Sequence, residues 1–202
     1  MHIAIVSGSH RKDSQSERVA KYLAARLEVL GAGVTSDVIS LAGNPLPLWD
    51  ESAMQADSAI SKMWWPYSER LKGADGLIFM APEWHGMVPP GLKNFLLFCT
   101  AAEVGHKPAL IVGVSSSKGG SYPVNEMRTS GYKNTRICYI PDHLIVQDVN
   151  NRFVGEAPAG ADDGYMRERA DFTLKILLEY TKALKGMRET AVLGDKKFAF
   201  GM

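Results

Sequence analysis

The fold class follows from the stretch Ile3-Ala4-Ile5-Val6-Ser7-Gly8-Ser9. Four apolar residues in succession, followed at once by a serine- and glycine-containing turn, predict a short strand that is buried on both faces. After the turn, apolar residues recur at helical spacing, at Val19, Ala20, Leu23, Leu27 and Leu30. A buried strand that leads through a polar loop into an amphipathic helix is the first half of a parallel βαβ unit.

The same alternation recurs along the chain. Further apolar runs lie at 77–80, 110–112 and 144–146, and the more polar run at 34–41 is expected to be an edge strand. The remaining patterns predict helices at 58–71, 91–102, 123–131 and 162–184, the last with a core face of Phe172, Ile176, Leu177 and Tyr180. We therefore predict one α/β domain over residues 1–202, with a doubly wound, five-stranded parallel sheet and a carboxyl-terminal tail at 187–202.

Composition excludes several classes of protein. A formal net charge of +1 provides no electrostatic basis for a nucleic-acid partner or an anionic membrane. No apolar run approaches the roughly 18–20 residues that span a bilayer, so we expect a cytoplasmic protein without a membrane partner. Two cysteines, Cys99 and Cys138, are too few for a disulfide framework or a structural zinc site, and no metal is expected.

The loop at residues 7–16 has the chemistry of a phosphate site. Ligands of open parallel sheets bind beyond the carboxyl ends of the strands, and this loop leads into a helix amino terminus. Its hydroxyl and guanidinium donors suit a terminal phosphate, and they are Ser9, Arg11, Ser14 and Ser16. It is neither a Walker A loop nor a dinucleotide fingerprint, because the required glycines and lysine are missing. In the alternative interpretation Ser14 only caps the helix and the cations are solvated; His10 and Lys12 are expected to face solvent.

Two further loops follow the third and fourth predicted strands. Residues 82–90 contain two large apolar side chains, Trp84 and Met87, in a segment stiffened by prolines, which could cradle a flat heterocycle. Alternatively, Trp84 completes the core. Residues 115–123 include Gly119 and Gly120, which permit positive φ and close approach of a ligand, although such loops are often plain connections.

Together the three loops resemble those of the NAD(P)H-dependent FMN reductases, a family that includes quinone, azo-dye and chromate reductases. The family's Gly-Ser-x-Arg-x-x-Ser loop is matched by Gly8, Ser9, Arg11 and Ser14. Its Pro-Glu-Tyr-Asn segment is represented by Pro82-Glu83-Trp84-His85. Its Pro-Gly-x-Leu-Lys-Asn run is represented, without the variable position, by residues 90–94. Its Ser-x-Gly-Gly loop is matched by Ser117, Gly119 and Gly120. The resemblance covers about the first two thirds of the chain and implies a flavodoxin-like fold with strand order 2-1-3-4-5.

The resemblance also implies a role for each matched residue. Ser9, Arg11, Ser14 and Ser16 would hold the phosphate of FMN. The isoalloxazine ring would be bordered by Pro82, Glu83, Trp84, His85 and Gly86. Its other edge would be closed by Ser117, Gly119 and Gly120. Trp84 and His85 replace the family's Tyr and Asn, and His85 is either a proton donor to the reduced acceptor or a polar contact.

The implied activity is NAD(P)H oxidation through FMN, passing two electrons to a small acceptor such as a quinone or free flavin. Hydride chemistry belongs to the cofactor, so no catalytic nucleophile is expected in the protein. Two alternatives are a flavodoxin-type one-electron carrier, against which Arg11 and the near-neutral charge argue, and a flavin-free binding or regulatory protein of the same fold. Trp64-Trp65 and Met87-Val88-Pro89 add apolar surface that favours a homodimer or homotetramer, with the alternative that both tryptophans are core residues.

Overall fold

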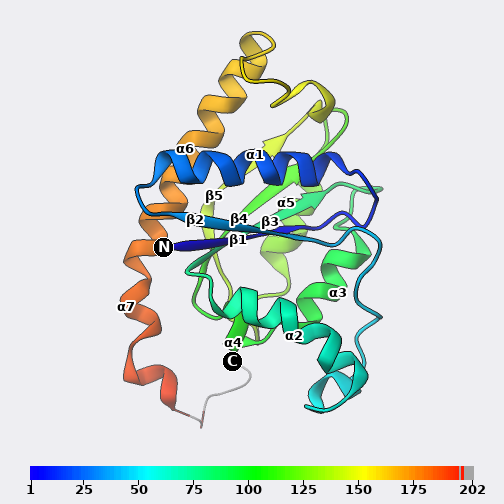
Figure 1. Cartoon of the computed structure of the whole chain (residues 1–202), viewed down its shortest axis with the longest axis vertical. Coiled ribbons are helices and arrows are strands. Elements are labelled where there is room, and N and C mark those ends of the chain that lie inside the picture. Colours follow the sequence, from blue (N-terminus) through cyan, green and yellow to red (C-terminus); the bar gives the residue numbers. More distant parts are fainter. Residues whose placement is uncertain (196, 198–202) are drawn as a thin grey trace.

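A single parallel sheet forms the centre of the computed structural model, which describes residues 1–195 and 197 (Figure 1). Its strands are β1 (His2–Ser7), β2 (Thr35–Ser40), β3 (Gly76–Pro82), β4 (Pro108–Val114) and β5 (Cys138–Val146). Their order is β2-β1-β3-β4-β5, and every neighbouring pair is parallel. The predicted fold class and strand order are therefore confirmed, and the polar run at 34–41 contains β2, an edge strand of the sheet.

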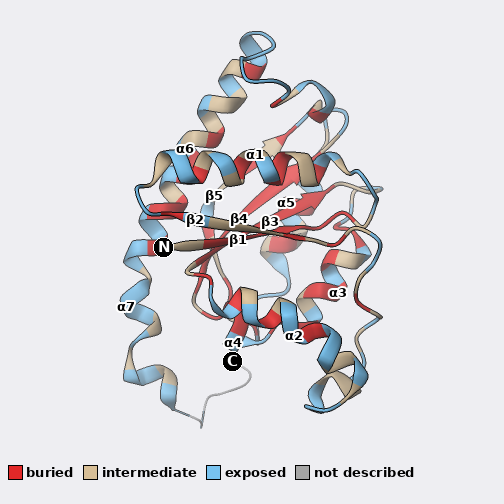
Figure 2. Ribbon diagram, in the orientation of Figure 1, coloured by how far each residue is buried: buried red, intermediate tan, exposed pale blue. Residues whose placement is uncertain are grey.

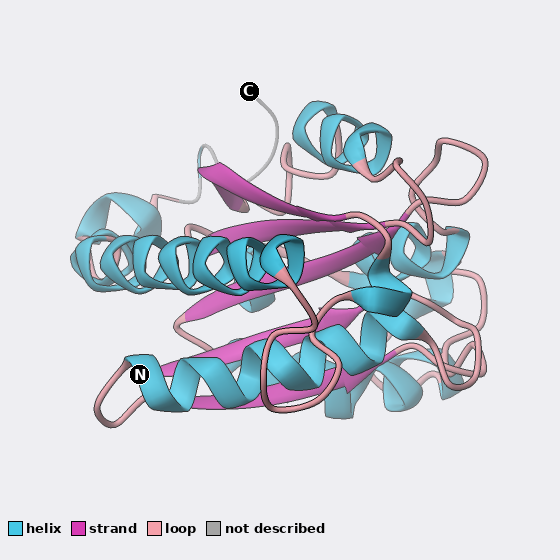
Figure 3. Cartoon of the chain, turned by 90° about the horizontal axis from the view of Figure 1, so that it is seen from above, coloured by secondary structure: helices cyan, strands magenta, loops and turns pink. Residues whose placement is uncertain are grey.

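Helices cover both faces of the sheet. The α-helices are α1 (Gln15–Leu30), α2 (Ala59–Lys72), α3 (Pro90–Phe98), α4 (Ala101–Val104), α5 (Ser121–Thr129), α6 (Ala161–Ala183) and α7 (Lys185–Arg188). The 3₁₀-helices are η1 (Glu51–Met54), η2 (Val149–Asn151) and η3 (Ala191–Gly194). The long helices α1 and α6 lie on one face, as the view from above shows (Figure 3). The other face is covered by α2, α3 and α5 (Figure 1).

Alternate residues of each central strand feed two separate cores. In β1, Ile3 and Ile5 pack toward α1 and α6, whereas Ala4 and Val6 pack toward the helices on the opposite face. All four of these side chains are fully buried, and β3 and β4 are buried along their whole lengths (Figure 2). Burial on both faces explains why these strands are continuous apolar runs rather than alternating patterns.

The predicted helix at 91–102 is wrong as a single element. The chain leaves the helix at Cys99, which has extended backbone angles, and starts again as α4. Thr100 and Glu103 form a reciprocal capping box at the new start, with the Glu103 carboxylate accepting from the Thr100 N–H at 2.9 Å. This cap stabilises a second helix amino terminus and so divides the segment.

The predicted core face of the last helix is right at Leu177 and Ile176, which pack against the core, and wrong at Phe172 and Tyr180. Phe172 is 56% exposed and Tyr180 lies at the surface, whereas Leu174 and Leu177 are fully buried. The buried face also carries small residues, and a Cβ placed on Gly76 of β3 would lie 2.6 Å from Thr181 Oγ1. Close approach of helix and sheet requires small residues there, which leaves the aromatic residues outside.

Helix α1 and the carboxyl-terminal segment complete the described fold. Ser14 caps α1 and Gly31 follows its last residue. The tail forms α7 and η3, and residues 196 and 198–202 of the predicted tail lie outside the described residues. Across residues 1–195 and 197, no helix combines the length and apolar character needed to cross a membrane.

Candidate active site

A cavity of about 380 Å³ lies at the carboxyl end of the sheet, where the loops after β1, β3, β4 and β5 meet. Of the predicted site residues, its wall contains Ser9, Arg11, Ser14, Ser16, Pro82, Glu83 and Trp84. His85, Gly86, Ser117, Gly119 and Gly120 are not part of this wall. The wall also includes residues that sequence reasoning missed, namely Asp13, Gln15, Val114, Ser115, Ser116, Val149 and Asn150.

One end of the cavity is the amino terminus of α1. The Ser14 hydroxyl accepts a hydrogen bond from the Glu17 N–H at 3.2 Å. The backbone carbonyl of Ser14 accepts hydrogen bonds from the N–H groups of Glu17 and Arg18. The cap leaves the N–H groups of Gln15 and Ser16 available, since the first turn of a helix has no internal acceptors for them. The Glu17 side chain does not complete a reciprocal capping box with Ser14, because its carboxylate accepts from Ser40 and pairs with Lys21 instead.

Two buried hydroxyl groups add to these donors. Ser9 and Ser16 are each only 2% exposed, yet both line the cavity. The Ser9 Oγ accepts from the Arg11 N–H at 3.3 Å, so its own proton remains free to be donated. Hydroxyls, helix N–H groups and the exposed Arg11 guanidinium together form a donor set that fits a phosphate monoester.

Gly8 has a packing role rather than a ligand-binding role. Its N–H donates to the Met80 carbonyl at 3.0 Å, and a Cβ at this position would collide with that oxygen and lie 2.7 Å from Leu92 Cδ2. Only glycine lets the loop leave β1 this close to β3 and α3.

The second loop makes a tight turn. The N–H and carbonyl groups of Trp84 and Met87 pair in both directions, at 2.9 and 3.1 Å, across His85 and Gly86. Both central residues have positive φ, 50° and 74°, as a type I′ turn requires. The turn holds Trp84 in the cavity wall and leaves His85 exposed.

His10 does not face solvent as predicted. Its ring stands edge-on to Trp84 with the centroids 4.4 Å apart, and its Nδ1 atom is buried. Nδ1 lies 3.2 Å from the position of a Cβ on Gly91, at the start of α3. The first and second loops therefore support one another through this contact.

The glycine-containing part of the third loop lies outside the cavity wall. The Gly120 N–H donates to the Glu83 carboxylate, and a Cβ on Gly119 would lie 2.8 Å from Glu83 Oε1. The Ser117 carbonyl accepts from the Asp148 N–H at 2.8 Å. Glu83 thus positions the Gly-Gly segment, and the preceding Ser115 and Ser116 face the cavity in its place.

Comparison with known proteins identifies the family. The family model for NADPH-dependent FMN reductase matches residues 1–151, well over half of the chain. The chain belongs to this family. The expected family is confirmed, and with it the oxidoreductase class and the family's use of FMN and NAD(P)H.

Curated relatives have matching descriptions. An NADPH azoreductase of Bacillus sp. (strain OY1-2) is 31% identical over 132 residues, which are 64% of this chain and 68% of the azoreductase. A quinone reductase of Pseudomonas putida is 29% identical over 133 residues, 61% of this chain and 64% of that enzyme. The match spans less than two thirds of the quinone reductase, so the electron acceptor named for that enzyme does not identify the acceptor of this chain.

Solved structures share the fold. The flavoenzyme NAD(P)H:(acceptor) oxidoreductase FerB from Paracoccus denitrificans superposes with a TM-score of 0.68 and 18% identity, covering 90% of this chain and 97% of FerB. The apo form of EMOB, an NADH:FMN oxidoreductase, superposes with a TM-score of 0.67 and 17% identity. The match covers 91% of this chain and 90% of EMOB. These similarities establish a flavodoxin-like architecture for this FMN reductase family member.

One wall of the cavity in this family member comes from a segment that sequence reasoning did not include. Val149 and Asn150 belong to η2, directly after β5. The Arg18 guanidinium holds this segment by donating to the carbonyls of Val149 at 2.6 Å, Arg152 at 2.8 Å and Phe153 at 3.0 Å. Burial lowers the pKa of Arg18 from its ordinary value, partly opposed by Asp163. The sequence could have indicated this wall, because the loop after a fifth parallel strand lies at the same edge of the sheet as the loops after the other strands.

Arg18→Met is expected to lower the free energy of unfolding by about 1–3 kcal/mol, because it leaves buried carbonyl groups without a donor while keeping the apolar stem. Urea unfolding monitored by far-ultraviolet circular dichroism measures the change. Lys21→Met, which removes an exposed cation one turn further along α1, serves as the control. Equal stability of the two variants would show that Arg18 does not secure this wall.

Glu83→Ala is expected to free the third loop, whereas Glu83→Gln keeps a carbonyl acceptor for the Gly120 N–H. Loss of a charge-assisted bond of about 1.5–3 kcal/mol corresponds to roughly ten- to hundred-fold faster local opening. Amide hydrogen exchange at Gly120 measures it. Identical exchange in the Ala and Gln variants would contradict the positioning role of Glu83.

The described residues 1–195 and 197 contain neither a pair of cysteines at the cavity nor a group of metal-binding side chains. Cys99 and Cys138 are both free, and burial raises the pKa of each thiol. Neither residue lines the cavity. Among residues 1–195 and 197, no three His, Cys, Asp or Glu side chains are grouped as metal ligands would be.

Proposed function

We propose that this chain oxidises NAD(P)H and passes two electrons, through FMN, to a small acceptor such as a quinone or free flavin. The observation that carries the proposal is the cavity at the α1 amino terminus, where buried hydroxyls, free N–H groups and a guanidinium converge. Bound FMN would supply the group that accepts a hydride and then reduces the second substrate.

In the proposed complex, the protein holds the FMN phosphate at one end. Ser9, Ser14 and Ser16 donate hydroxyl hydrogen bonds, the α1 terminus contributes its N–H groups and positive dipole end, and Arg11 adds a cationic fork. Asp13 also lies in the wall, with φ of 50°, and its carboxylate must turn away from a phosphate. We assign Arg11 the largest single contribution because it supplies the only guanidinium among the described residues of the cavity wall.

The other end borders the flat ring in this proposal. Pro82, Glu83 and Trp84 already line the cavity, and His85 and Gly86 form the tip of the turn beside them. Ser117, Gly119 and Gly120 close the far edge of the ring in this proposal. Their segment is held by the hydrogen bond from the Gly120 N–H to the Glu83 carboxylate and by the bond from the Asp148 N–H to the Ser117 carbonyl. Trp84 and the half-exposed Met87 then wall an apolar slot over the ring, in which the nicotinamide and afterwards a flat acceptor fit in turn.

One slot used twice predicts ping-pong kinetics. Initial rates of NADPH oxidation, measured with FMN-loaded protein over a grid of NADPH and quinone concentrations, should give parallel double-reciprocal lines. Intersecting lines would show that both substrates bind together and would exclude a shared slot. Absence of turnover with every small acceptor would contradict the proposed activity.

We also predict that the chain assembles as a homodimer or homotetramer and that it acts in the cytoplasm. Trp65 is 61% exposed and Met87 51% exposed, and both were predicted interface residues, whereas Trp64, Val88 and Pro89 are buried. The tryptophan pair is therefore divided between core and surface. Light scattering across a dilution series is expected to show a dimer or larger species at working concentrations, and an active monomer would exclude the assembly.

A further inference from the structure

One carboxylate of α5 reaches across to the second loop. Glu126 Oε2 accepts a hydrogen bond from the Val88 N–H at 2.6 Å, and Oε1 pairs with the Lys93 ammonium of α3. Burial by itself would raise the pKa of Glu126, but Lys93 and the Val88 N–H outweigh it and hold that pKa below its ordinary value. Glu126 is therefore a charged acceptor, and it lies outside the wall of the flavin cavity.

The Val88 N–H is important for the second loop because of its place in the chain. It directly follows the turn in which Trp84 and Met87 pair in both directions, and it precedes two prolines, which have no N–H to donate. Val88 is only 3% exposed, so water cannot easily replace the carboxylate as its partner. The bond to Glu126 thus anchors the end of the turn that holds Trp84 in the cavity wall.

A second carboxylate bond joins the same two parts of the chain in the opposite direction. Glu83 of the second loop accepts from the N–H of Gly120, the residue before α5. The segment from Glu83 to Val88 and the segment from Gly120 to Glu126 are therefore closed into one ring by two hydrogen bonds. The segments follow different strands, β3 and β4, and hydrogen bonds to carboxylates are stronger than those between neutral groups.

Helix α5 connects the two bonds through packed structure. Gly120 has a φ of 108° and lies against β4, since a Cβ on Gly113 would fall 2.1 Å from the Gly120 carbonyl oxygen. Further along the helix, Val124 and Met127 are buried in the core on either side of Glu126 in the sequence. Because a close-packed helix moves as a unit, release of the bond at one end is expected to reach the other end.

We propose that Glu126 is a positioning residue for the ring end of the flavin site. Its bond to Val88, together with the bond from Gly120 to Glu83, fixes the separation between the second and third loops. This role rests on the proposed function, in which the two loops border opposite edges of the isoalloxazine ring. It differs from the role of Arg11, because Glu126 acts on the space for the ring and not on the phosphate.

Titration of Glu126→Ala with FMN and with riboflavin tests this role. Both Kd values are expected to rise together, by about ten-fold or more, whereas Arg11→Ala affects FMN alone. Glu126→Gln loses the half-exposed ion pair with Lys93 but keeps a carbonyl acceptor for the Val88 N–H, so it should restore most of the affinity. Asn125→Ala, at an exposed position of α5, should leave both Kd values unchanged.

Two outcomes of the titration are contrary and distinct. An unchanged riboflavin Kd in Glu126→Ala would overturn the positioning role while leaving the proposed function in place. Wild-type protein that binds neither flavin would overturn the proposed function itself, and with it the flavin role of Glu126.

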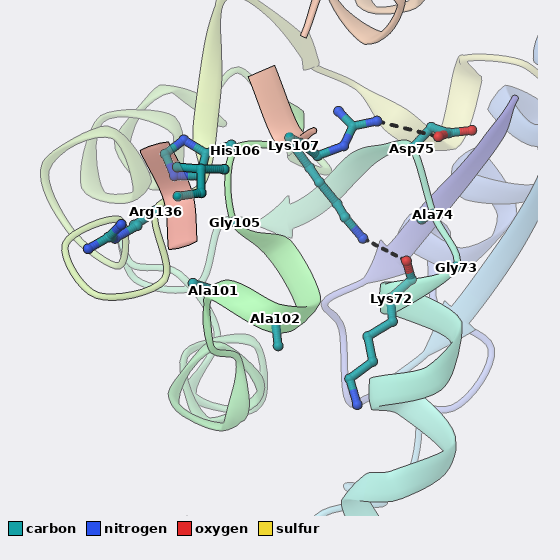
Figure 4. A pocket seen from close by; sticks show the side chains of 12 residues that line it. Lys72, Gly73, Ala74, Asp75, Ala101, Ala102, Gly105, His106, Lys107 and Arg136 are labelled. Atoms are coloured by element: carbon teal, nitrogen blue, oxygen red, sulfur yellow. Dashed lines mark hydrogen bonds and ion pairs between the residues drawn. The ribbon is translucent and has the colours of Figure 1, made fainter. Parts of the chain in front are cut away.

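Amide hydrogen exchange in the full chain without added flavin tests the ring of bonds. Glu126→Ala is expected to speed exchange about ten- to hundred-fold at both Val88 and Gly120. The reference amides are those of Gly73 and Lys107, whose N–H groups donate to backbone carbonyls. These two residues line a separate cavity of about 530 Å³ at the amino ends of the strands, which shares no residue with the flavin cavity (Figure 4).

Exchange at the reference amides should stay as in the wild type. Faster exchange at Val88 alone would show that the two bonds are independent and would overturn the proposal. Equal acceleration at all four amides would also overturn it, because Glu126 would then serve the stability of the whole fold and not the spacing of the two loops.

Discussion

Replacing Arg11 with alanine is expected to weaken FMN binding about ten- to hundred-fold while leaving riboflavin binding nearly unchanged. Loss of a charge-assisted pair costs about 1.5–3 kcal/mol, and riboflavin has no phosphate for Arg11 to contact. Arg11 is exposed at the wall of the cavity, so its removal should not disturb the core. Fluorescence titration of each variant with both flavins measures the effect.

Lys12→Ala is the matched control for this prediction. It removes a positive charge from the neighbouring exposed position, which does not line the cavity, and therefore tests for general electrostatic attraction. An equal loss for FMN in both variants would mean that net charge, not contact, governs binding. An equal loss for FMN and riboflavin in Arg11→Ala would place the phosphate elsewhere.

Phe95→Ala is expected to have the largest effect on stability, lowering the free energy of unfolding by about 3–5 kcal/mol. Phe95 is fully buried on α3, edge-on to Trp64 at 5.2 Å and to Tyr67 at 6.1 Å between ring centroids. Removing its ring leaves a cavity where α3 packs against α2. Denaturant unfolding measures the loss.

Leu97→Ala serves as the control on the same helix. Leu97 is 63% exposed, so its truncation should change the free energy of unfolding by about 0.5 kcal/mol or less. A similar loss in the two variants would contradict the assignment of Phe95 to the core and of Leu97 to the surface.

The sheet was predictable because burial on both faces leaves a local pattern. Continuous apolar runs marked β1, β3 and β4, and the polar character of Thr35–Ser40 marked the edge. The face of α6 was not predictable in the same way. Its contact with the sheet depends on the close approach of Thr181 to Gly76, and no periodicity within the helix reports the space available there.

The convergence of residues at the start of α1 was predictable from the sequence, and the placement of the third loop was not. Ser9, Arg11, Ser14 and Ser16 lie within eight residues of one another and meet through local geometry at a helix start. The placement of Gly119 and Gly120 depends instead on Glu83, 37 residues from Gly120. A bond between distant segments leaves no local pattern, so the sequence did not indicate that Ser115 and Ser116 would line the cavity.

Anaerobic stopped-flow mixing of FMN-loaded protein with NAD(P)H, unlabelled or deuterated at C4, tests the central claim most directly. The proposed activity predicts that NAD(P)H abolishes the flavin absorbance, that deuterium slows this loss, and that a quinone added afterwards restores the colour. If NAD(P)H leaves the absorbance unchanged while a protein electron donor abolishes it, the chain is a one-electron carrier and the reductase assignment is wrong.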